Sequence, residues 1–532
     1  METLASTVLT TASIVVFYLL LLTCLVLLLI LGFRSLRSNK KPGAPGPKPW
    51  PLIGSLHLMD GYKIPFAAFT ELSQKYGNIF SIKLGNSWCV VVNDPKDVKE
   101  VLITKGAHFD GRPTLRRFDV LFGGDKENSL AFCNNSMAQK KRRQILQKFT
   151  FPHLNSDLGI TLDRLCQEEC NQLIAIIQEK ASFCETIDLK PLIIKGCANI
   201  FSQYFCSTER FDYENYNFAQ YCNSFDEIFW EVNNGRAVDF LPWLMPFYEN
   251  STACFAMKKA TCVVRSFVKE FIINAKRLSQ GPHANSSTPK DFLDTIMVYL
   301  NDEKSLKQEA ILTSQTALFA LEDILGGHSA VANIILRILY DISLQKEYAA
   351  KITGQIEIVQ SDKIGLISLE EKHRLPVIVA AMHETIRLTC SPIVPHQATQ
   401  DSSIGGHLVP KDTVIFVNNH ALNMSDKFWN SPSKYDPIRF IDTSTGDFVK
   451  PSHFQPFSMG KRSCMGYKMV HNIAFSLVAN ILLHFDLESP SNSEKSIPLG
   501  MLALPSKPFE FTIRPKQKKK LSRNNFQRRN FA

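Results

Sequence analysis

The stretch that decides the fold reads Phe457-Ser458-Met459-Gly460-Lys461-Arg462-Ser463-Cys464-Met465-Gly466. A cysteine in such a loop can supply a soft anionic axial ligand to haem iron, and thiolate donation favours O–O cleavage. Gly460 and Gly466 let the backbone turn tightly around the sulfur and direct N–H groups to it. Arg462 can pair with a haem propionate, and Phe457 can pack against the porphyrin. Most lone cysteines are buried structural residues, but that alternative does not explain the combined spacing of Phe, Gly, Arg, Cys and Gly.

Composition and charge exclude several classes of protein. The chain has 532 residues, of which 45% are hydrophobic and 21% charged, and this is ordinary globular composition. The formal net charge of +10 comes from the two ends, because the segment 49–513 holds 47 basic and 49 acidic residues. The near-neutral body gives no support to a nucleic-acid partner.

The N-terminal region predicts a membrane anchor. Residues 12–33 read ASIVVFYLLLLTCLVLLLILGF without a charged residue, a run of about 22 residues that can span a bilayer core at ~1.5 Å per residue. Basic residues follow this run, so the positive-inside rule places the remaining chain in the cytosol, and the pattern disfavours a cleaved signal peptide or a mitochondrial presequence. We expect an endoplasmic-reticulum anchor at 1–34, a basic, proline-rich hinge at 35–54, a catalytic domain at 55–513 and a basic, disordered tail at 514–532.

The periodicity of apolar residues predicts a mainly α fold with small β-sheets. Three- and four-residue spacing predicts helices at 161–180, 188–206, 256–280, 309–345, 371–389 and 466–485. Strands are expected in 79–92 and 413–418, and 281–290 reads as a polar surface loop. The thirteen cysteines are scattered without paired spacing, so in a cytosolic domain we expect reduced thiols.

Two further motifs complete a family resemblance. Glu384 and Arg387 in HETIR lie at i, i+3 on one helical face, where they can form an ion pair. With the cysteine loop, the anchor and the proline hinge, the chain resembles a microsomal cytochrome P450, a haem-thiolate monooxygenase. The pair matches the E-x-x-R of that family, and Arg439 in DPIRF resembles the third member of its Glu–Arg–Arg network. The resemblance implies the cytochrome P450 fold and a network that braces the cysteine loop.

The resemblance also implies a cofactor and partners. Cys464 would be the proximal ligand of haem b, with Arg462, His396 of PHQAT, Arg112 of FDGRP and Arg142 as propionate contacts. Because Ala138 stands where the family has Trp four residues before Arg142, Arg143 is an alternative. The implied partners are O2, the lipid bilayer and NADPH–cytochrome P450 reductase, which a basic surface including Lys461 could receive. Cytochrome b5 is a further candidate partner.

One segment departs from the family pattern. Most relatives carry A/G-G-x-D/E-T in the long central helix, whereas this chain reads DILGGHSAV from Asp323 to Val331. Aligning the glycines puts Ala330 at the threonine, and aligning through Asp323 and Arg337 puts Val331 there, so both alignments lack the hydroxyl. We expect Gly326 and Gly327 to open the helix beside the haem. Proton delivery must then come from Ser329, His328, ordered water or the substrate's own hydroxyl, and water or substrate is favoured.

The sequence of the same helix points to one group within the family. The GGHSAVAN stretch, PHQATQD and DPIRF together resemble the Spook group of insect enzymes, which act in ecdysteroid synthesis, and this implies oxidation of a sterol intermediate. Residues 211–248 contain twelve aromatics, which suits a pocket for a fused-ring lipid; core packing or a membrane-facing surface are alternatives. The rival functions are a haem-thiolate isomerase or dehydratase that needs no external electrons, a xenobiotic or lipid monooxygenase, and a non-catalytic haem-dependent sterol binder.

Overall fold

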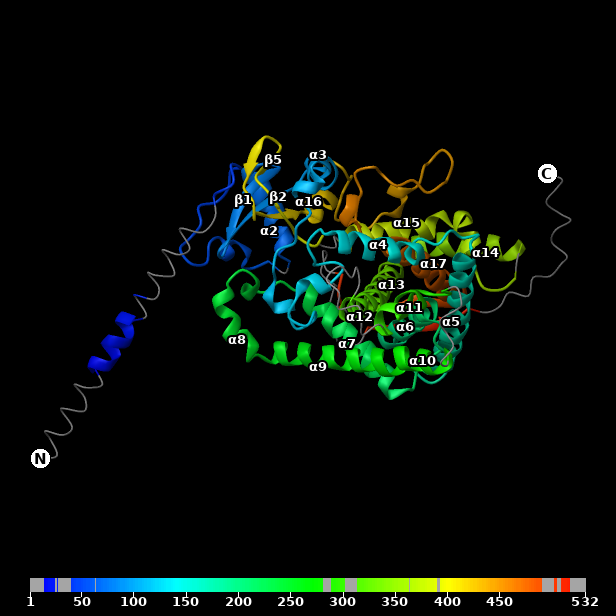
Figure 1. Ribbon diagram of the computed structural model, residues 1–532. Helices are drawn as coiled ribbons and strands as arrows, with labels where there is room; N and C mark the ends of the chain where they lie inside the picture. The colour runs from blue at the N-terminus through cyan, green and yellow to red at the C-terminus, as the bar shows by residue number, and fades with distance from the viewer. Residues whose placement is uncertain are drawn as a thin grey trace, which may run out of the picture. The chain divides into compact units, whose positions relative to one another are not determined.

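A computed structural model describes residues 14–23, 26, 40–62, 64–280, 289–301, 313–362, 364–389, 393–489, 502–504 and 509–516. The chain divides into two compact units, which are coloured along the chain in Figure 1. The smaller unit consists of Met1–Arg116, Arg236–Pro246 and Pro395–Asn418, and the larger of Arg117–Gly235, Phe247–Val394 and Asn419–Ala532. The catalytic domain expected at 55–513 therefore contributes residues to both units.

The smaller unit is built on a four-stranded sheet in the order β1-β2-β7-β4. Strands β1 and β2 form an antiparallel hairpin in which Ile79 faces Val92 and Leu84 faces Ser87, and Gly85 makes the turn with a φ of 54°. Apolar side chains from β1, β2 and β7 pack against Phe69 of α2. Its elements are α2 (Pro65–Tyr76), β1 (Ile79–Leu84), β2 (Ser87–Val92), α3 (Pro95–Lys99), β4 (His396–Gln397), β5 (Ser402–Ile404), β6 (His407–Val409) and β7 (Val414–Val417), with short helices η1 (Leu56–Met59), η2 (Glu100–Thr104), η3 (Gly106–His108), η6 (Ala237–Asp239) and η7 (Pro242–Leu244).

The larger unit is mainly helical. Helices α5, α6, α13 and α17 pack on one another around the main apolar core, and Figure 1 shows them gathered together. Its helices are α4 (Met137–Thr150), α5 (Asp157–Ala181), α6 (Lys190–Cys206), α7 (Tyr216–Asn233), α9 (Thr252–Phe267), α10 (Ala275–Gln280), α11 (Phe292–Asn301), α12 (Ser314–Leu325), α13 (Gly327–Ser343), α14 (Lys346–Asp362), α15 (Pro376–Thr389), α16 (Asn419–Asn423) and α17 (Tyr467–His484), with η5 (Lys126–Asn128), η8 (Val268–Asn274), η10 (Leu369–Arg374), η11 (Pro437–Phe440) and η12 (Gly460–Arg462). The short helices η4 (Arg116–Phe118) and α8 (Met245–Glu249) lie where the chain passes from one unit to the other.

A three-stranded sheet completes the larger unit. Its order is β3 (Thr186–Asp188), β9 (Glu510–Pro515) and β8 (Phe485–Glu488), all antiparallel. The sheet extends into the segment expected to form a disordered tail, because Arg514 and Pro515 belong to β9. Lys516 also donates its backbone N–H to His484 O at 2.8 Å.

The structure confirms the mainly α character with small sheets, and it changes some boundaries. The helix expected at 371–389 begins at Pro376, and 369–374 form the 3-10 helix η10. Proline fixes φ near the helical value and needs no N–H partner in the first turn, so it is suited to begin α15. Most of the loop expected at 281–290 lies outside the described residues, as does 517–532.

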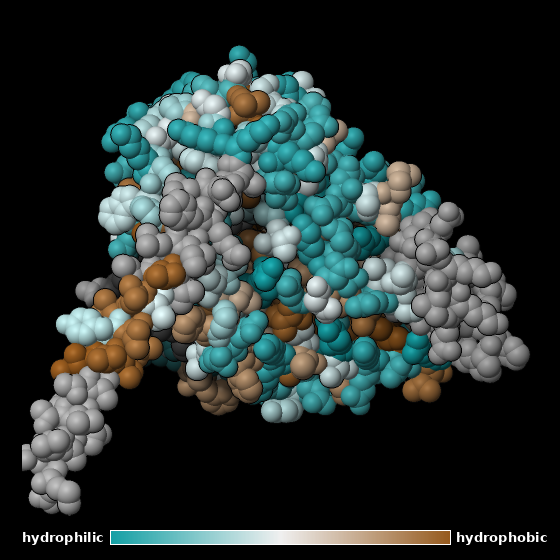
Figure 2. Space-filling view, turned by 60° about the vertical axis from the view of Figure 1, so that its left-hand side comes forward, coloured by the Kyte–Doolittle hydropathy of each residue, from teal (hydrophilic) through white to brown (hydrophobic). Residues whose placement is uncertain are grey.

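Part of the expected anchor is a helix. Residues Ile14–Thr23 form this helix, and their side chains are exposed and mostly apolar, as Figure 2 shows. Among the described residues, the one helix long and apolar enough to cross a membrane is Ser314–Ser343, of which two thirds is buried inside the protein. Those residues form α12 and α13, which belong to the core. The N-terminal helix is compatible with membrane anchoring.

Candidate functional site

The cysteine loop turns tightly before α17. Cys464 N–H donates to Phe457 O at 2.9 Å, and Ser463 N–H donates to Gly460 O at 3.2 Å. Gly460 has a φ of 75°, as the expected turn requires, and Ser458 adopts a φ of 63° without being glycine. Gly466 has a φ of −89°, so the backbone itself does not require glycine at this position.

The surroundings of Cys464 combine enclosure with access. The side chain of Cys464 is exposed, yet the protein atoms around it raise the pKa of the thiol by desolvation. The backbone N–H groups of Gly466 and Tyr467 and the guanidinium of Arg143 act in the opposite direction and favour the thiolate. A Cβ added at Gly466 would meet no described atom within 4 Å. The described atoms therefore leave space at Gly466, two residues after the sulfur-bearing residue.

Two arginines predicted to contact propionates lie near this loop in the larger unit. Arg462 donates from Nη2 to the carbonyls of Ala131 and Cys133, and its Nη1 is buried without a hydrogen-bond partner in the part of the chain that the structure describes. Arg142 donates to Asn128 O at 3.1 Å and Glu127 O at 2.9 Å. Arg462 thus keeps a donor for an anionic group. Both terminal nitrogens of Arg142 hold the preceding loop, but its Nε is also buried without a hydrogen-bond partner among the described residues.

Arg143 has a different task. It donates from Nη2 to Ser463 O at 2.8 Å and thereby ties α4 to the residue before Cys464. Together with its effect on the thiol pKa, this contact makes Arg143 a support of the cysteine loop. Its role as an alternative to Arg142 stays a prediction.

The other two predicted propionate contacts lie together in the smaller unit. Arg112 is buried and donates to Pro395 O at 3.0 Å. His396 is also buried, and its Nδ1 lies 2.7 Å from Phe109 O. The structure thus brings Arg112 and His396 together through neighbouring backbone, and it brings Cys464, Arg462 and Arg142 together in the other unit.

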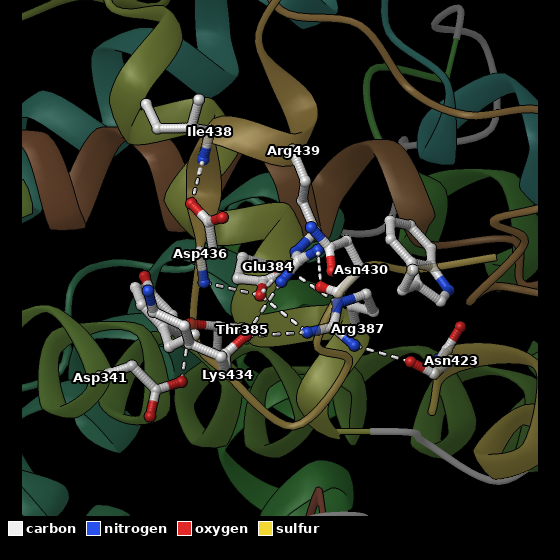
Figure 3. A network of polar contacts seen from close by, with 12 residues as sticks. Asp341, Glu384, Thr385, Arg387, Asn423, Asn430, Lys434, Asp436, Ile438 and Arg439 are labelled. Atoms are coloured by element: carbon white, nitrogen blue, oxygen red, sulfur yellow. Dashed lines mark hydrogen bonds and ion pairs between the residues drawn. The ribbon is translucent and has the colours of Figure 1, made fainter. Parts of the chain in front are cut away.

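The predicted Glu–Arg–Arg network is present in full (Figure 3). Arg387 donates from Nε to Glu384 Oε2 at 2.8 Å and from Nη2 to Oε1 at 2.7 Å, a bidentate pair in which both side chains are fully buried. Arg439 adds a contact from Nε to Glu384 Oε1 at 3.1 Å, and the backbone N–H of Asp436 donates to the same oxygen at 2.9 Å. The carboxylate is therefore satisfied on both oxygens, as a buried charge requires.

The structure adds an aromatic member that the motifs did not indicate. The Trp429 ring lies 5.1 Å from Arg387 Cζ and 5.9 Å from Arg439 Cζ, so one indole contacts both cations of the network. It also packs at 90° on Phe454, three residues before Phe457. This edge-on contact connects the network to the start of the cysteine loop and supports its bracing role.

The glycine pair in the central helix serves close packing. Gly326 separates α12 from α13, and a Cβ there would come within 2.8 Å of Phe225 Cε1 in α7. A Cβ at Gly327 would come within 2.9 Å of Phe201 Cε1 in α6. The approach of two aromatic rings gives one reason for the small size of both residues. That these glycines open the helix beside the haem stays a prediction.

His328 belongs to the same aromatic packing. Its ring stacks on Tyr221 at 5.7 Å and meets Phe225 edge-on at 5.2 Å, and Nδ1 lies 2.7 Å from Leu325 O. Burial lowers the pKa of His328 to about 4, so the imidazole is neutral near pH 7. Of the proton sources considered, this arrangement gives no support to His328.

Some of the aromatics of 211–248 also belong to the core. Phe218 and Tyr221 pack on Phe267 of α9 at 6.2 and 4.3 Å, and Phe211 stacks on Phe218 at 4.9 Å. Phe218 and Tyr221 are buried and Phe211 is partly buried, so these three rings belong to the core next to α9. Trp243 and Phe247 are exposed.

The donors near Cys464 fit a thiolate-bound haem. The motif supplies one soft sulfur ligand, N–H groups that damp its charge, space at Gly466 and a free guanidinium nitrogen on Arg462 for an anionic substituent.

Comparison with known proteins also indicates which family the chain belongs to. The protein-family model described as Cytochrome P450 matches residues 44–513. Cytochrome P450 307a1 of Drosophila melanogaster is 37% identical over 497 residues, covering 89% of each chain. Steroid 17-alpha-hydroxylase/17,20 lyase of Squalus acanthias is 26% identical over 88% of this chain and 91% of its own, and Cytochrome P450 1B1 of Rattus norvegicus is 27% identical over 90% and 88%. With its cysteine loop and buried Glu–Arg–Arg network, the chain belongs to the cytochrome P450 family, whose members bind haem through a cysteine thiolate.

Proposed function

We propose that this cytochrome P450 oxidises a sterol intermediate in ecdysteroid synthesis, using O2 and electrons from NADPH–cytochrome P450 reductase. The observation that carries the proposal is the stretch 326–333, GGHSAVAN, which resembles the Spook group of insect enzymes and lacks the usual threonine. The 37% identity to an insect cytochrome P450, against 26% and 27% for the two vertebrate relatives above, is consistent with an insect-type activity.

Different residues of the chain have different roles in this proposed reaction. Bound haem supplies dioxygen activation, with thiolate donation favouring O–O cleavage. Cys464 would hold the iron, the N–H groups of Gly466 and Tyr467 would stabilise the negative sulfur, and Arg462 would pair with a propionate. Arg112, His396 and Arg142 are proposed as the other propionate contacts, the first two through the smaller unit.

Charge on the outside of the cysteine loop supports a reductase partner. Lys461 is exposed, and α4, which Arg143 ties to the loop, exposes Lys140, Lys141 and Lys148. A basic surface of this kind would steer an acidic electron-transfer protein to the side of the molecule that carries the thiolate. The reductase, and cytochrome b5 as a second candidate, would dock there.

The proposed location is the endoplasmic-reticulum membrane with a cytosolic catalytic domain. The apolar helix Ile14–Thr23 and the basic residues that follow the 12–33 run support this orientation.

The test is reconstitution with the reductase. Full-length protein is expressed with haem, and the reduced carbon-monoxide difference spectrum is recorded beside Cys464→Ser. The long-wavelength Soret band should be present only in the wild type. Wild-type enzyme, reductase and NADPH are then incubated with 7-dehydrocholesterol, and the product is identified by mass spectrometry.

The outcomes separate the rival functions. A sterol product whose formation consumes NADPH supports the proposal. Product formed equally without NADPH indicates isomerase or dehydratase chemistry, and oxidation of unrelated lipids but not of sterols indicates a xenobiotic or lipid monooxygenase. Stoichiometric sterol binding without turnover indicates a haem-dependent sterol binder.

A further inference from the structure

A cavity of about 420 Å³ lies between α5 and η10 in the larger unit, and its lining includes no residue of the site around Cys464. The charged residues of the lining are Asp163, Arg164 and Glu168 of α5 and Glu370 of η10. Three carboxylates against one guanidinium leave an excess of two negative charges. The cavity therefore favours a cationic occupant.

Two of the three carboxylates can take a further partner. Asp163 is committed to the protein, because both of its oxygens accept hydrogen bonds, one of them from Leu369 N–H at 3.0 Å. Glu168 pairs with Arg164 at 2.6 Å, but both side chains are more than half exposed, so this pair contributes little and can exchange. Glu370 is exposed and forms no ion pair with any described residue.

An apolar edge borders these carboxylates. It consists of Leu154, which precedes α5, and Ile160, whose side chains are 42% and 59% exposed. Burial and the nearby carboxylates of Glu371 and Glu370 raise the pKa of Asp163, in agreement with a negative field at the cavity. The cavity therefore suits cationic side chains with an apolar residue among them better than it suits an isolated small cation.

The C-terminal tail of this chain has such a composition. Residues 517–532 follow the last residues that the structure describes. They include six basic residues and no acidic one, and they begin QKKKLSR, so that Leu521 stands between Lys520 and Arg523. The segment Lys518–Arg523 thus complements the cavity both in charge and in its apolar residue.

The described chain ends close to the cavity. Lys516 donates its N–H to His484 O at 2.8 Å and its Nζ to Leu482 O at 2.7 Å, at the end of α17. One turn earlier on α17, Asn480 donates to Ile367 O at 3.0 Å. The cavity-lining residues of η10 and its N-cap follow Ile367 directly in the chain. The end of α17 therefore lies between Lys516 and the cavity.

The tail is long enough to reach the cavity. Helix α17 packs against both α5 and α14, and Figure 1 shows these three helices near one another. A helix with its side chains is about 10–12 Å across, so Lys516 lies on the order of 10–20 Å from Ile367. Residues 517–523 span about 23 Å when extended at about 3.3 Å per residue. Because docking is intramolecular, at an effective concentration on the order of millimolar, weak ion pairs suffice.

We propose that the segment Lys518–Arg523 of this chain docks in the cavity between α5 and η10. Its lysines pair with Glu168 and Glu370, and Leu521 contacts the apolar edge. The docked segment connects β9, the last strand, to α5 and to the short helix before α15, and it thereby holds the end of the sheet against the helices. The inference does not depend on the substrate proposed above.

The test is carbodiimide crosslinking of the full-length, haem-loaded protein in phosphatidylcholine nanodiscs. The reagent joins a lysine amine to a carboxylate that it contacts, so mass spectrometry should find the three tail lysines joined to Glu168 or Glu370. A rise in NaCl from about 0.05 M to about 1 M, where the Debye length is about 3 Å, should reduce these crosslinks about fivefold or more. A mixture of isotope-labelled and unlabelled protein shows whether the joined residues belong to one chain.

Paired variants give a second readout. Lys519→Gln with Lys520→Gln removes two charges inside the proposed segment, and Arg528→Gln with Arg529→Gln is the matched control, which removes two charges outside it. Hydrogen exchange is followed in the peptides that line the cavity. Exchange there should be about threefold or more faster in the lysine variant than in the wild type, and unchanged in the arginine variant.

Four results would overturn the inference. The first is absence of the crosslinks together with equal exchange in all proteins, which would mean that the tail does not occupy the cavity. The second is crosslinks only between labelled and unlabelled chains, which would assign the cavity to a second copy. The third is equal loss of protection in both variants, which would show that net charge matters and the segment does not. The fourth is absence of crosslinks combined with shielding of the tail lysines from acetylation when phosphatidylserine is added, which would assign the tail to the anionic bilayer.

Discussion

Replacing Arg387 by Met should destabilise the protein far more than the same change at Arg439, although both arginines contact Glu384. Arg387 provides two of the contacts to the carboxylate, at 2.7 and 2.8 Å, and also donates to Asn423 O at 2.6 Å. Glu384 and Arg387 are fully buried, and removing one partner of such a pair costs about 3–5 kcal/mol because the other charge is left in the interior. Arg439 supplies one contact to Glu384 at 3.1 Å and leaves the bidentate pair intact, so its loss should cost about 1.5–3 kcal/mol.

The assay is the half-life of irreversible thermal inactivation, read as loss of haem absorbance, because a chain of this size is best characterised kinetically. If the contacts break before the rate-limiting step, a difference of about 2 kcal/mol between the variants corresponds to about 30-fold in half-life. A double variant Glu384→Gln, Arg387→Met should be less unstable than the sum of its parts, since the uncompensated charge is gone. Equal half-lives for Arg387→Met and Arg439→Met would refute the argument from burial.

Three further predictions concern the central helix. Gly327→Ala should lower the melting temperature, because overpacking against Phe201 costs about 1–3 kcal/mol and outweighs the helix-propensity gain of about 1 kcal/mol. Gly354→Ala in α14, where a Cβ meets no described atom within 4 Å, should raise the melting temperature. A rise in both variants would contradict the reasoning. The pKa of Asp323 is about 6 in the folded chain against an ordinary 3.8, so the folded state loses stability as pH rises from about 4 to about 6, and Asp323→Asn should gain more in melting temperature near pH 7.5 than near pH 4.5. The pKa of His328 is lowered to about 4, so the folded state loses stability as pH falls from about 6.5 to about 4. His328→Phe should reduce that loss. An unchanged fall in melting temperature between these pH values would contradict the lowered pKa of His328.

The motifs with fixed spacing could be predicted from the sequence. Cys464 and the ion pair of Glu384 with Arg387 depend on neighbours within a few residues, and helical periodicity places that pair on one face. The long helices were likewise predictable from the period of their apolar residues. The 3-10 helix 369–374 was not, because its residues resemble in composition those of a first α-helical turn, and the sequence does not separate it from the α-helix that follows.

Contacts between distant segments could not be read from the sequence. The aromatic partners of Gly326 and Gly327 come from α6 and α7, more than 100 residues earlier, so the glycines indicate close approach without naming what approaches. Trp429 has no spacing relation to the two arginines it contacts. Asp323 served to align the helix, but its contacts depend on how Leu130 and Ser129 fold back onto it.

The sheet of the larger unit has a consequence for biosynthesis. Its central strand, β9, ends 17 residues before the end of the chain and pairs with β3, which is made more than 300 residues earlier. At about 5–20 residues per second the ribosome needs roughly 16–65 s between the two strands. Throughout that interval β3 has no partner in the sheet, and a nascent strand without its neighbour is a site for wrong pairing. Quality control should therefore recognise chains that terminate before residue 510 as unfinished, even though the cysteine loop has already been translated.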